Sequence, residues 1–418
     1  MEASLYIHVP FCAGACEYCD FYSVTLKPGD HRPERYITTL LLEGERLLEM
    51  YPFDLESLPA PGGRIDPLGI PTVFIGGGTP SVLGPEGTSR LLRGLSELIA
   101  RYSSSPPIEI TIEANPETTD EAFLAAIREG GVTRLSLGIQ TFYGPSRKAV
   151  KRIGDETQLS WRLALAQEYF PGAFSVDLIS GLPCQDEKVL LNDIAGILLY
   201  RPAHVSLYAL TAKLNTSFAV PDEDEAGRLW LCGRDALEKS GYSQYEVSNF
   251  CLGGKESLHN IRYWRMYNWL ALGPAASGTI INDQRGRGFR YTIPHDVDTW
   301  LRSGGCGFFK EQKYPPAIEE LDTLTLIKES LLMGFRYFKG PDEDLFRRRF
   351  RLGINDLIPK TISSWRERGS LQKGTMALTK DGLLFLNRFL LDAFEELDES
   401  SSELDRSSSE LDAVFPAW

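Results

Sequence analysis

The chain has 418 residues, 43% of them hydrophobic and 24% charged, and its formal net charge is −13. This length exceeds the usual size of one hydrophobic core, so we expect one large domain and a smaller one. The negative charge argues against nucleic acid as a partner. No apolar run is long enough to span a membrane, and no charged n-region precedes an apolar stretch at the N-terminus, so we expect a cytoplasmic protein.

The cysteines form one tight cluster. Of the seven, only Cys12, Cys16 and Cys19 lie close together, and this pattern indicates a reducing compartment rather than a disulfide framework. They follow the apolar run 5–9, which predicts a buried strand that stops at Pro10. Three thiolates leave one coordination position of a metal site without a protein ligand. An incomplete zinc site or a chance cluster is the alternative.

Helices and strands alternate after the cysteine loop. Helical spacing over 33–50 predicts the first helix, and the Pro- and Gly-rich residues 52–70 indicate a loop. Five further strands separated by helices predict an α/β fold with a parallel sheet and right-handed crossovers. The predicted strands are 72–75, 108–113, 134–139, 175–179 and 205–209, and the predicted helices between them are 119–129, 161–168 and 189–199.

Glycines and polar residues gather at the predicted strand ends. The strand 72–75 runs into a turn of three glycines at 76–78, where a ligand can approach the backbone closely; a plain turn between strand and helix is the alternative. Glu113, Gln140 and Asp177 stand at the ends of three other strands. Buried polar groups are costly without partners, so their repetition indicates a shared ligand. For each one alone, a hydrogen-bonded structural role is the alternative.

The Cys-x3-Cys-x2-Cys spacing with Tyr18 resembles the radical S-adenosylmethionine (SAM) superfamily, and the Gly-Gly-Gly-Thr-Pro-Ser turn resembles its oxygen-independent coproporphyrinogen oxidase branch. The resemblance implies a partial (β/α)6 TIM-like barrel. It also implies that the three cysteines hold three irons of a 4Fe-4S cluster and that SAM chelates the fourth. We expect Tyr6 and Phe21 to shield the cluster from water. The SAM-binding residues that the resemblance implies are Tyr6, Gly76, Gly77, Gly78, Thr79, Glu113, Gln140 and Asp177.

Two positions depart from the family's pattern. The usual Gly-Arg-x-His is replaced by Gly154-Asp-Glu-Thr, so Asp155 stands where an Arg would face the SAM carboxylate, and we expect it to repel that group. Arg152 is a candidate replacement. At Ser277 the family commonly has a His, so a second heme ligand or hydrogen-bond partner is missing.

A further motif follows the predicted barrel. His259, Asn260, Tyr263 and Trp264 form an H-N-x-x-Y-W sequence that closely resembles the HemW proteins, which are heme chaperones. Imidazole binds heme iron, and aromatic rings pack against a macrocycle. The resemblance implies that these residues contact heme as cargo, whereas a structural role for a buried His is the equally weighted alternative. It also implies heme-accepting partners such as respiratory cytochromes, with transient contact to membrane proteins.

The chain divides into four predicted parts. Residues 1–240 form the barrel, 241–310 an extension packed on it, 311–390 a C-terminal domain similar to that of the coproporphyrinogen oxidases, and 391–418 an acidic Ser-rich tail. Predicted helices at 321–334, 341–350 and 355–368, a hairpin at 374–384 and a last helix suggest a small α+β, winged-helix-like domain. The tail repeats Glu-Leu-Asp with one apolar residue per repeat, so we expect disorder there.

Two functions share this architecture. The first is a HemW-like chaperone that binds a cluster, SAM and heme; the second is an oxygen-independent coproporphyrinogen III oxidase of porphyrin biosynthesis, which decarboxylates two propionates. Phe21 stands where the oxidases carry another cysteine, only residues 1–11 precede Cys12 where the oxidases have an arm, and H-N-x-x-Y-W is typical of the chaperones. These features favour the chaperone. A purely structural metal-binding protein is the third reading.

Overall fold

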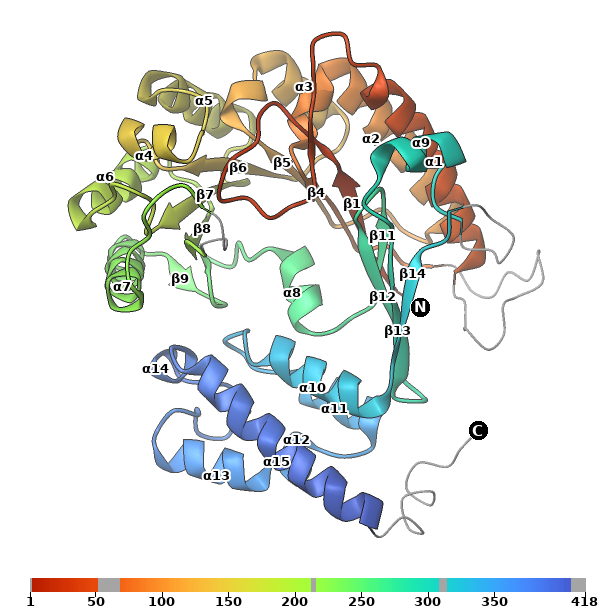
Figure 1. Ribbon diagram of the computed structural model, residues 1–418, viewed down its shortest axis with the longest axis vertical. Helices are drawn as coiled ribbons and strands as arrows, with labels where there is room; N and C mark the ends of the chain where they lie inside the picture. The colour runs from red at the N-terminus through yellow and green to blue at the C-terminus, as the bar shows by residue number, and fades with distance from the viewer. Residues whose placement is uncertain (1, 52–67, 212–215, 308–313, 407–418) are drawn as a thin grey trace.

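The structure is a computed structural model that describes residues 2–51, 68–211, 216–307 and 314–406. A curved sheet of twelve strands forms its centre, in the order β14-β13-β12-β11-β1-β4-β5-β6-β7-β8-β10-β9. Helices cover the outer face of the sheet, and a separate group of C-terminal helices lies below it in Figure 1.

The predicted parallel strands make up the middle of the sheet, so the α/β barrel prediction is confirmed. Their side chains read as nearly continuous buried runs, as expected where both faces of a parallel sheet are covered. All of them end at the same edge. These strands are β1 (Ser4–Val9), β4 (Thr72–Gly77), β5 (Glu109–Ala114), β6 (Arg134–Gln140), β7 (Phe174–Ser180) and β8 (His204–Ala209).

The crossover helices begin at well-defined caps. Asp120, Asp155, Asp186 and Asp222 each accept a hydrogen bond from a backbone N–H in the first turn of the helix that follows, which satisfies a donor that has no partner within the helix. The helices are α1 (Arg32–Met50), α2 (Gly84–Tyr102), α3 (Glu121–Glu129), α4 (Gly144–Ala149), α5 (Glu156–Tyr169), α6 (Glu187–Leu198) and α7 (Glu223–Lys239).

Strands added at both edges leave the barrel partial. β11 (Trp269–Leu272) pairs parallel to β1, and β12 (Ser277–Asn282), β13 (Arg287–Thr292) and β14 (Ala317–Leu321) continue antiparallel. At the other edge, β10 (Asn249–Cys251) and β9 (Ser243–Gln244) pair antiparallel beside β8. Helix α8 (Leu258–Trp264) lies between these edges, and α9 (Val297–Ser303) lies beside α1 (Figure 1).

The C-terminal helices have a core of their own, in which Phe389 contacts Phe335 and Trp365 with ring centroids 4.4 and 5.2 Å apart. The predicted helix 355–368 is split before Pro359, whose ring cannot continue the preceding helix. The predicted hairpin is one antiparallel bridge between Leu371 and Leu378. The helices are α10 (Thr323–Gly334), α11 (Glu343–Phe350), α12 (Ile354–Leu357), α13 (Pro359–Glu367), α14 (Lys380–Leu383) and α15 (Leu386–Arg406).

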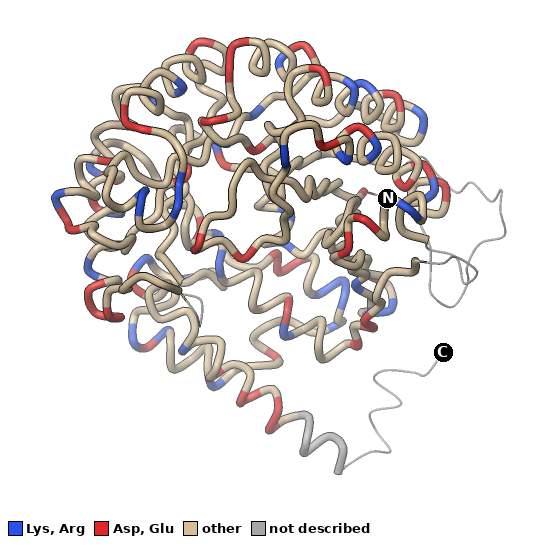
Figure 2. Tube along the Cα trace, turned by 45° about the horizontal axis from the view of Figure 1, so that its top comes forward, with Lys and Arg blue, Asp and Glu red and all other residues tan. Residues whose placement is uncertain are grey.

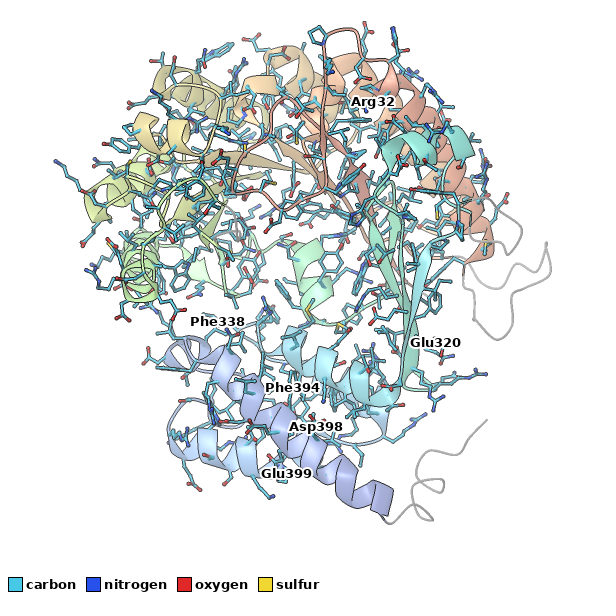
Figure 3. The ribbon with its side chains drawn as sticks, in the orientation of Figure 1. Arg32, Glu320, Phe338, Phe394, Asp398 and Glu399 are labelled. Atoms are coloured by element: carbon cyan, nitrogen blue, oxygen red, sulfur yellow. The ribbon has the colours of Figure 1, made fainter. Side chains whose placement is uncertain are left out.

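Helix α15 corrects the prediction of a disordered tail from residue 391. Its residues 391–400 are helical, and Ala393 and Leu397 are buried, because their spacing puts them on one apolar face. The Glu396 carboxylate accepts N–H groups at the start of α13. Figure 3 labels Asp398 on this helix, where it pairs with Lys328 at 2.6 Å. Residues 52–67 of the predicted loop and 407–418 of the tail lie outside the described residues.

Figure 2 shows acidic and basic residues interspersed along the described part of the chain. Within the described ranges, no helix has the length and apolar character needed to cross a membrane.

A buried carboxylate joins α1 to the β11–β12 turn and to α9. Glu43 Oε1 accepts hydrogen bonds from Trp300 Nε1 at 2.8 Å and from the Cys306 N–H at 2.6 Å, and Oε2 accepts one from the Gly273 N–H at 2.8 Å. The side chain is fully buried. Burial raises the pKa of Glu43 from 4.5 to about 7, although the three hydrogen bonds oppose that shift.

Glu43→Gln should change how stability depends on pH. A carboxyl whose pKa is raised on folding stabilises the fold most below its unfolded pKa and loses that contribution as pH rises through about 7. The free energy of unfolding of wild type, relative to that of Glu43→Gln, should therefore fall by up to about 3 kcal/mol between roughly pH 5 and pH 8. Urea unfolding at both pH values measures it, with the exposed Glu97→Gln as control. If the two free energies of unfolding differ by the same amount at both pH values, the raised pKa of Glu43 is contradicted.

Leu397→Ala should show that 391–400 belongs to the folded core. Removing this buried side chain should cost about 2–4 kcal/mol of unfolding free energy, whereas Leu391→Ala, at a side chain that is 53% exposed on the same helix, should cost far less. Thermal or urea unfolding of the two variants compares them directly. Equal effects would show that the packing of α15 described above is wrong.

Candidate functional site

The cysteine loop leaves the C-terminal end of β1, where it was predicted. The pairing of β2 (Phe11–Cys12) with β3 (Val24–Thr25) closes the loop, and all three thiols are partly exposed. In the described part of the chain, no three His, Cys, Asp or Glu side chains converge around one point where a single metal ion would sit. A 4Fe-4S cluster needs no such convergence, because its thiolates bind different iron atoms.

A path of hydrogen bonds joins two of the thiols across the strand ends. Cys12 Sγ lies 3.4 Å from Thr79 Oγ1, which accepts a hydrogen bond from Asn115 Nδ2 at 2.8 Å. Arg152 Nη2 donates to Asn115 Oδ1 at 2.6 Å, and its Nη1 donates to Cys16 Sγ at 3.6 Å. Because the Thr79 oxygen already accepts from Asn115, its own hydrogen is free to point at Cys12. The path therefore offers donors to two sulfurs, which stabilises thiolates.

A buried arginine holds the loop that carries Arg152. Arg147 Nη1 donates to the carbonyls of Ile139 and Thr141, both at 2.9 Å, and Nε donates to that of Gly154 at 2.9 Å. Its side chain is almost fully buried. Burial lowers the pKa of Arg147 to about 10, so it remains charged at neutral pH. These bonds fix the end of β6 against the segment before α5.

The Gly-rich turn is needed for close packing. A Cβ on Gly76 would lie 2.6 Å from Glu113 Oε2, and one on Gly77, whose φ is +110°, would lie 2.7 Å from His8 Nδ1. The Gly77 N–H donates to Glu113 Oε2 at 3.2 Å, and the Gly78 N–H is bonded to the backbone at the end of β1. The glycines therefore let β1 and β5 present polar side chains immediately beside the turn.

Two carboxylates meet inside the barrel. Burial, together with the nearby Asp177, raises the pKa of Glu113 to about 8. Burial also raises the pKa of Asp177, against the hydrogen bonds from Ser206 and Ser136. Two buried carboxylates with this mutual repulsion favour a ligand that brings hydroxyl or ammonium donors.

The end of β6 leaves polar atoms without partners. Gln140 lies after a bulge in the pairing with β7, with φ at +68°, and within the described residues its buried Oε1 has no hydrogen-bond partner. The buried Nε of Arg152 likewise has none. A Cβ on Gly138 would lie 3.0 Å from Asn115 Oδ1 and from Gln140 Nε2, so a larger residue would press on both amides. An unpaired acceptor beside an unpaired donor fits a ligand that carries both kinds of group, as an amino acid does.

Tyr6 belongs to a relay under the cysteine loop. Its hydroxyl lies 3.1 Å from His8 Nδ1, and His8 Nε2 lies 2.9 Å from the Tyr22 carbonyl. Because a carbonyl only accepts, Nε2 carries the hydrogen and Nδ1 accepts from Tyr6. The Phe21 side chain, two residues after the third cysteine, is 69% exposed, and its role in shielding the cluster stays a prediction.

The two departures from the family pattern are explained by their positions. Asp155 is exposed and caps α5, where its side chain accepts the Gln158 N–H at 2.9 Å. This cap uses the carboxylate that was predicted to repel SAM, and the repulsion itself stays a prediction, whereas Arg152, the candidate replacement, points into the strand ends. Ser277 donates to the Tyr291 carbonyl at 3.2 Å within the β12–β13 pair, so it has a structural partner.

The H-N-x-x-Y-W motif lies on α8 at the opposite end of the barrel. His259 Nδ1 is 2.8 Å from Thr72 Oγ1, at the first residue of β4, and its Nε2 is 3.0 Å from the Tyr263 hydroxyl. Glu109, the first residue of β5, accepts the N–H of His259 at 2.9 Å. The His259 ring is fully buried, and burial lowers its pKa to about 3.

These contacts do not support the prediction that His259 binds heme. Both ring nitrogens already have protein partners, and the ring faces the N-terminal ends of the strands, away from the cysteine loop. The backbone N–H of Asn260 bonds to the Ser257 cap at 3.4 Å, and Trp264 packs toward the C-terminal helices, where the Arg336 guanidinium lies 5.7 Å from its ring. In this structure the motif joins the barrel to the C-terminal helices.

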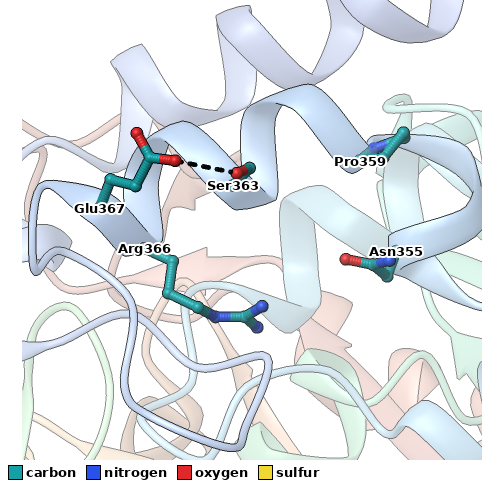
Figure 4. Close-up of a pocket in the computed structure, with 5 residues that line it drawn as sticks. All are labelled: Asn355, Pro359, Ser363, Arg366 and Glu367. Atoms are coloured by element: carbon teal, nitrogen blue, oxygen red, sulfur yellow. Dashed lines mark hydrogen bonds between the residues drawn. The ribbon is translucent and has the colours of Figure 1, made fainter.

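A hollow of about 450 Å³ lies elsewhere, on the surface of α12 and α13. Figure 4 shows its lining residues, among which Ser363 bonds to Glu367 at 3.2 Å. The side chains around it are mostly exposed. It lies in the C-terminal helices, apart from the strand ends where the polar groups converge, so we do not assign the site to it.

The fold and the cysteine loop define a radical SAM protein, and the sequence profile of the Radical SAM superfamily matches residues 6–193. The heme chaperone HemW of Escherichia coli is 34% identical over 398 residues, which cover 93% of this chain and 97% of that protein. A bovine relative, radical S-adenosyl methionine domain-containing protein 1, mitochondrial, is 30% identical over 96% of this chain and 89% of its own length. The chain belongs to the HemW family.

A solved structure confirms the fold. Coproporphyrinogen III oxidase (HemN) from Escherichia coli, a radical SAM enzyme, superposes with a TM-score of 0.73, covering 94% of this chain and 90% of that one. At 19% sequence identity this likeness concerns the fold alone. Membership of the radical SAM superfamily implies a 4Fe-4S cluster and SAM, and the donor set described above fits both.

Asp155→Asn and Arg152→Gln should show which of these two neighbouring residues contributes to SAM binding. Asp155→Asn keeps a capping side chain and removes the charge, so SAM affinity should stay within about twofold. Arg152→Gln removes a charged donor beside the unpaired Gln140, so SAM affinity should fall roughly tenfold or more. Calorimetric titration of anaerobically reconstituted protein measures both. Tighter SAM binding by Asp155→Asn would mean that Asp155 does face the ligand.

Proposed function

We propose that this chain is a HemW-type heme chaperone that holds a 4Fe-4S cluster on Cys12, Cys16 and Cys19, binds SAM at the same edge of the barrel, and delivers heme to acceptor proteins. The observation that carries the proposal is the hydrogen-bonded path from Cys12 to Cys16. When bound together, the cluster and SAM supply reductive cleavage of a sulfonium bond. What the chain supplies is position and shielding.

Each polar strand end has a role in this proposal. Arg152 presents its guanidinium toward the SAM carboxylate, and the unpaired Oε1 of Gln140 accepts from a ligand donor. Glu113 and Asp177, deeper in the barrel, accept hydrogen bonds from ammonium or ribose hydroxyl groups. Tyr6, through His8, holds the base of the cysteine loop. The Gly-rich turn and Thr79 keep these groups in contact with the loop.

Heme and its acceptors are the proposed partners. The relatives named heme chaperones cover nearly all of this chain, which supports heme as cargo and heme-accepting proteins such as respiratory cytochromes as recipients. We propose that the protein acts in the cytoplasm and contacts membrane proteins transiently.

Reconstituted protein should bind heme without producing protoporphyrinogen. Anaerobic reconstitution should give about four iron and four sulfide per chain in wild type, and Cys12→Ser, Cys16→Ser and Cys19→Ser should each lose most of both. Cys232→Ser, remote from the loop, is the control. Saturable hemin binding together with no decarboxylation of coproporphyrinogen III supports the chaperone. Efficient decarboxylation would instead identify the oxidase. Zinc in place of iron and sulfide would contradict both the chaperone and the oxidase assignment.

A further inference from the structure

The histidines of this chain differ sharply in their access to a ligand. The chain has five, and all lie in the described ranges. His8, His204 and His259 are buried, and both ring nitrogens of each lie within hydrogen-bond distance of protein atoms. His31 and His295 are exposed. Without a rearrangement of the core, these two alone can offer imidazole to an external ligand.

The exposed pair lies at one junction, between the starts of α1 and α9. His31 precedes Arg32, labelled in Figure 3, whose Nη1 lies 3.7 Å from Asp298 Oδ1 on α9. His295 stands just before the Asp296 cap of α9. Both histidines are therefore on the side of the barrel where the cysteine loop emerges, opposite the end closed by His259.

His295 is the one that contacts the cysteine loop. Its ring centroid lies 5.4 Å from that of Tyr22, with the planes inclined by 34°. Tyr22 is itself fixed at two points, because its hydroxyl accepts the Val297 N–H at 3.1 Å and its carbonyl accepts from His8 Nε2 at 2.9 Å. An exposed imidazole thus rests on an anchored aromatic ring that belongs to the cysteine loop.

We propose that His295 supplies the imidazole that coordinates heme iron, with the Tyr22 ring packed against that imidazole as its support. The inference rests on the proposed function, namely that the chain carries heme. The step is a ligand exchange without redox change: a ring nitrogen of His295 donates its lone pair to the ferric iron, and a water molecule leaves the iron. Imidazole is a common protein ligand of heme iron. Because that lone pair lies in the imidazole plane, the macrocycle would stand across the ring, and Tyr22, inclined to the imidazole by 34°, would meet it with an edge.

This placement would bring heme to the same edge of the barrel as the cluster. His8 connects the Tyr22 carbonyl to Tyr6 inside the barrel, so the imidazole that binds the cargo would rest on the residue where this hydrogen-bonded relay ends. A heme held at His259 would instead need the α8 contacts with β4 and β5 to open. The exposed position requires no such change.

The test is a hemin titration of the full-length, anaerobically reconstituted protein. We expect His295→Ala to weaken binding at least about tenfold and to shift the Soret band, and added imidazole to restore the wild-type spectrum to His295→Gly, because free imidazole can fill the vacated position. His31→Ala, at the other exposed imidazole of the same junction, should bind like wild type. Unfolding midpoint and iron and sulfide content confirm that each variant is folded and loaded.

Each of the other outcomes contradicts either His295 as the heme ligand or the chaperone proposal itself. Unchanged affinity and spectrum in His295→Ala, equal loss in His31→Ala, or loss confined to variants of the exposed thiol Cys184 would each reject His295 as the ligand while leaving the chaperone proposal intact. Absence of saturable hemin binding by wild type would reject the chaperone proposal itself. Loss of binding in His259→Ala with a wild-type unfolding midpoint would place the heme at the opposite end.

Discussion

The site depends on a constraint that no single strand could meet. Cys12 and Cys16 are held through Thr79, Asn115 and Arg152, which come from the ends of β4 and β5 and from the loop before α5. Because Thr79 and Arg152 each reach one sulfur and Asn115 links the two, a shift of any one strand end would change the position of the loop. The parallel register that brings the strand ends to one edge is therefore also what shapes the cysteine loop.

The two ends of the barrel carry different kinds of residues, functional groups at one end and stabilising groups at the other. At the C-terminal end, glycines, unpaired polar atoms and carboxylates with raised pKa values surround an open edge. At the N-terminal end, His259 and Glu109 are fully satisfied by hydrogen bonds, and α8 closes the barrel. This agrees with the general rule that barrel enzymes keep functional groups at the C-terminal face and stabilising groups at the other.

Sequence reasoning found the elements that depend on local pattern. The six parallel strands and the cysteine loop follow from apolar runs and residue spacing, and Glu113, Gln140 and Asp177 follow from their place at strand ends. The same rule would have found Asn115, which comes directly after β5. It could not reveal that Asp155 faces solvent or that His259 has both nitrogens occupied, since these facts arise from contacts between segments far apart in sequence. The helical part of 391–400 was missed because charge density outweighed the buried stripe of Leu390, Ala393 and Leu397.

The position of α8 indicates that the H-N-x-x-Y-W motif serves the fold rather than ligand binding. His259 and Trp264 join strands β4 and β5 to the C-terminal helices, so their importance to the fold alone would keep such residues together in a sequence. A motif shared with proteins named heme chaperones thus need not touch heme. What a ligand requires is access, and on this criterion the exposed ring beside Tyr22 is better placed than the buried one. Cargo and cluster would then meet at one edge, where the loop that carries the thiols also carries the ring that supports the imidazole.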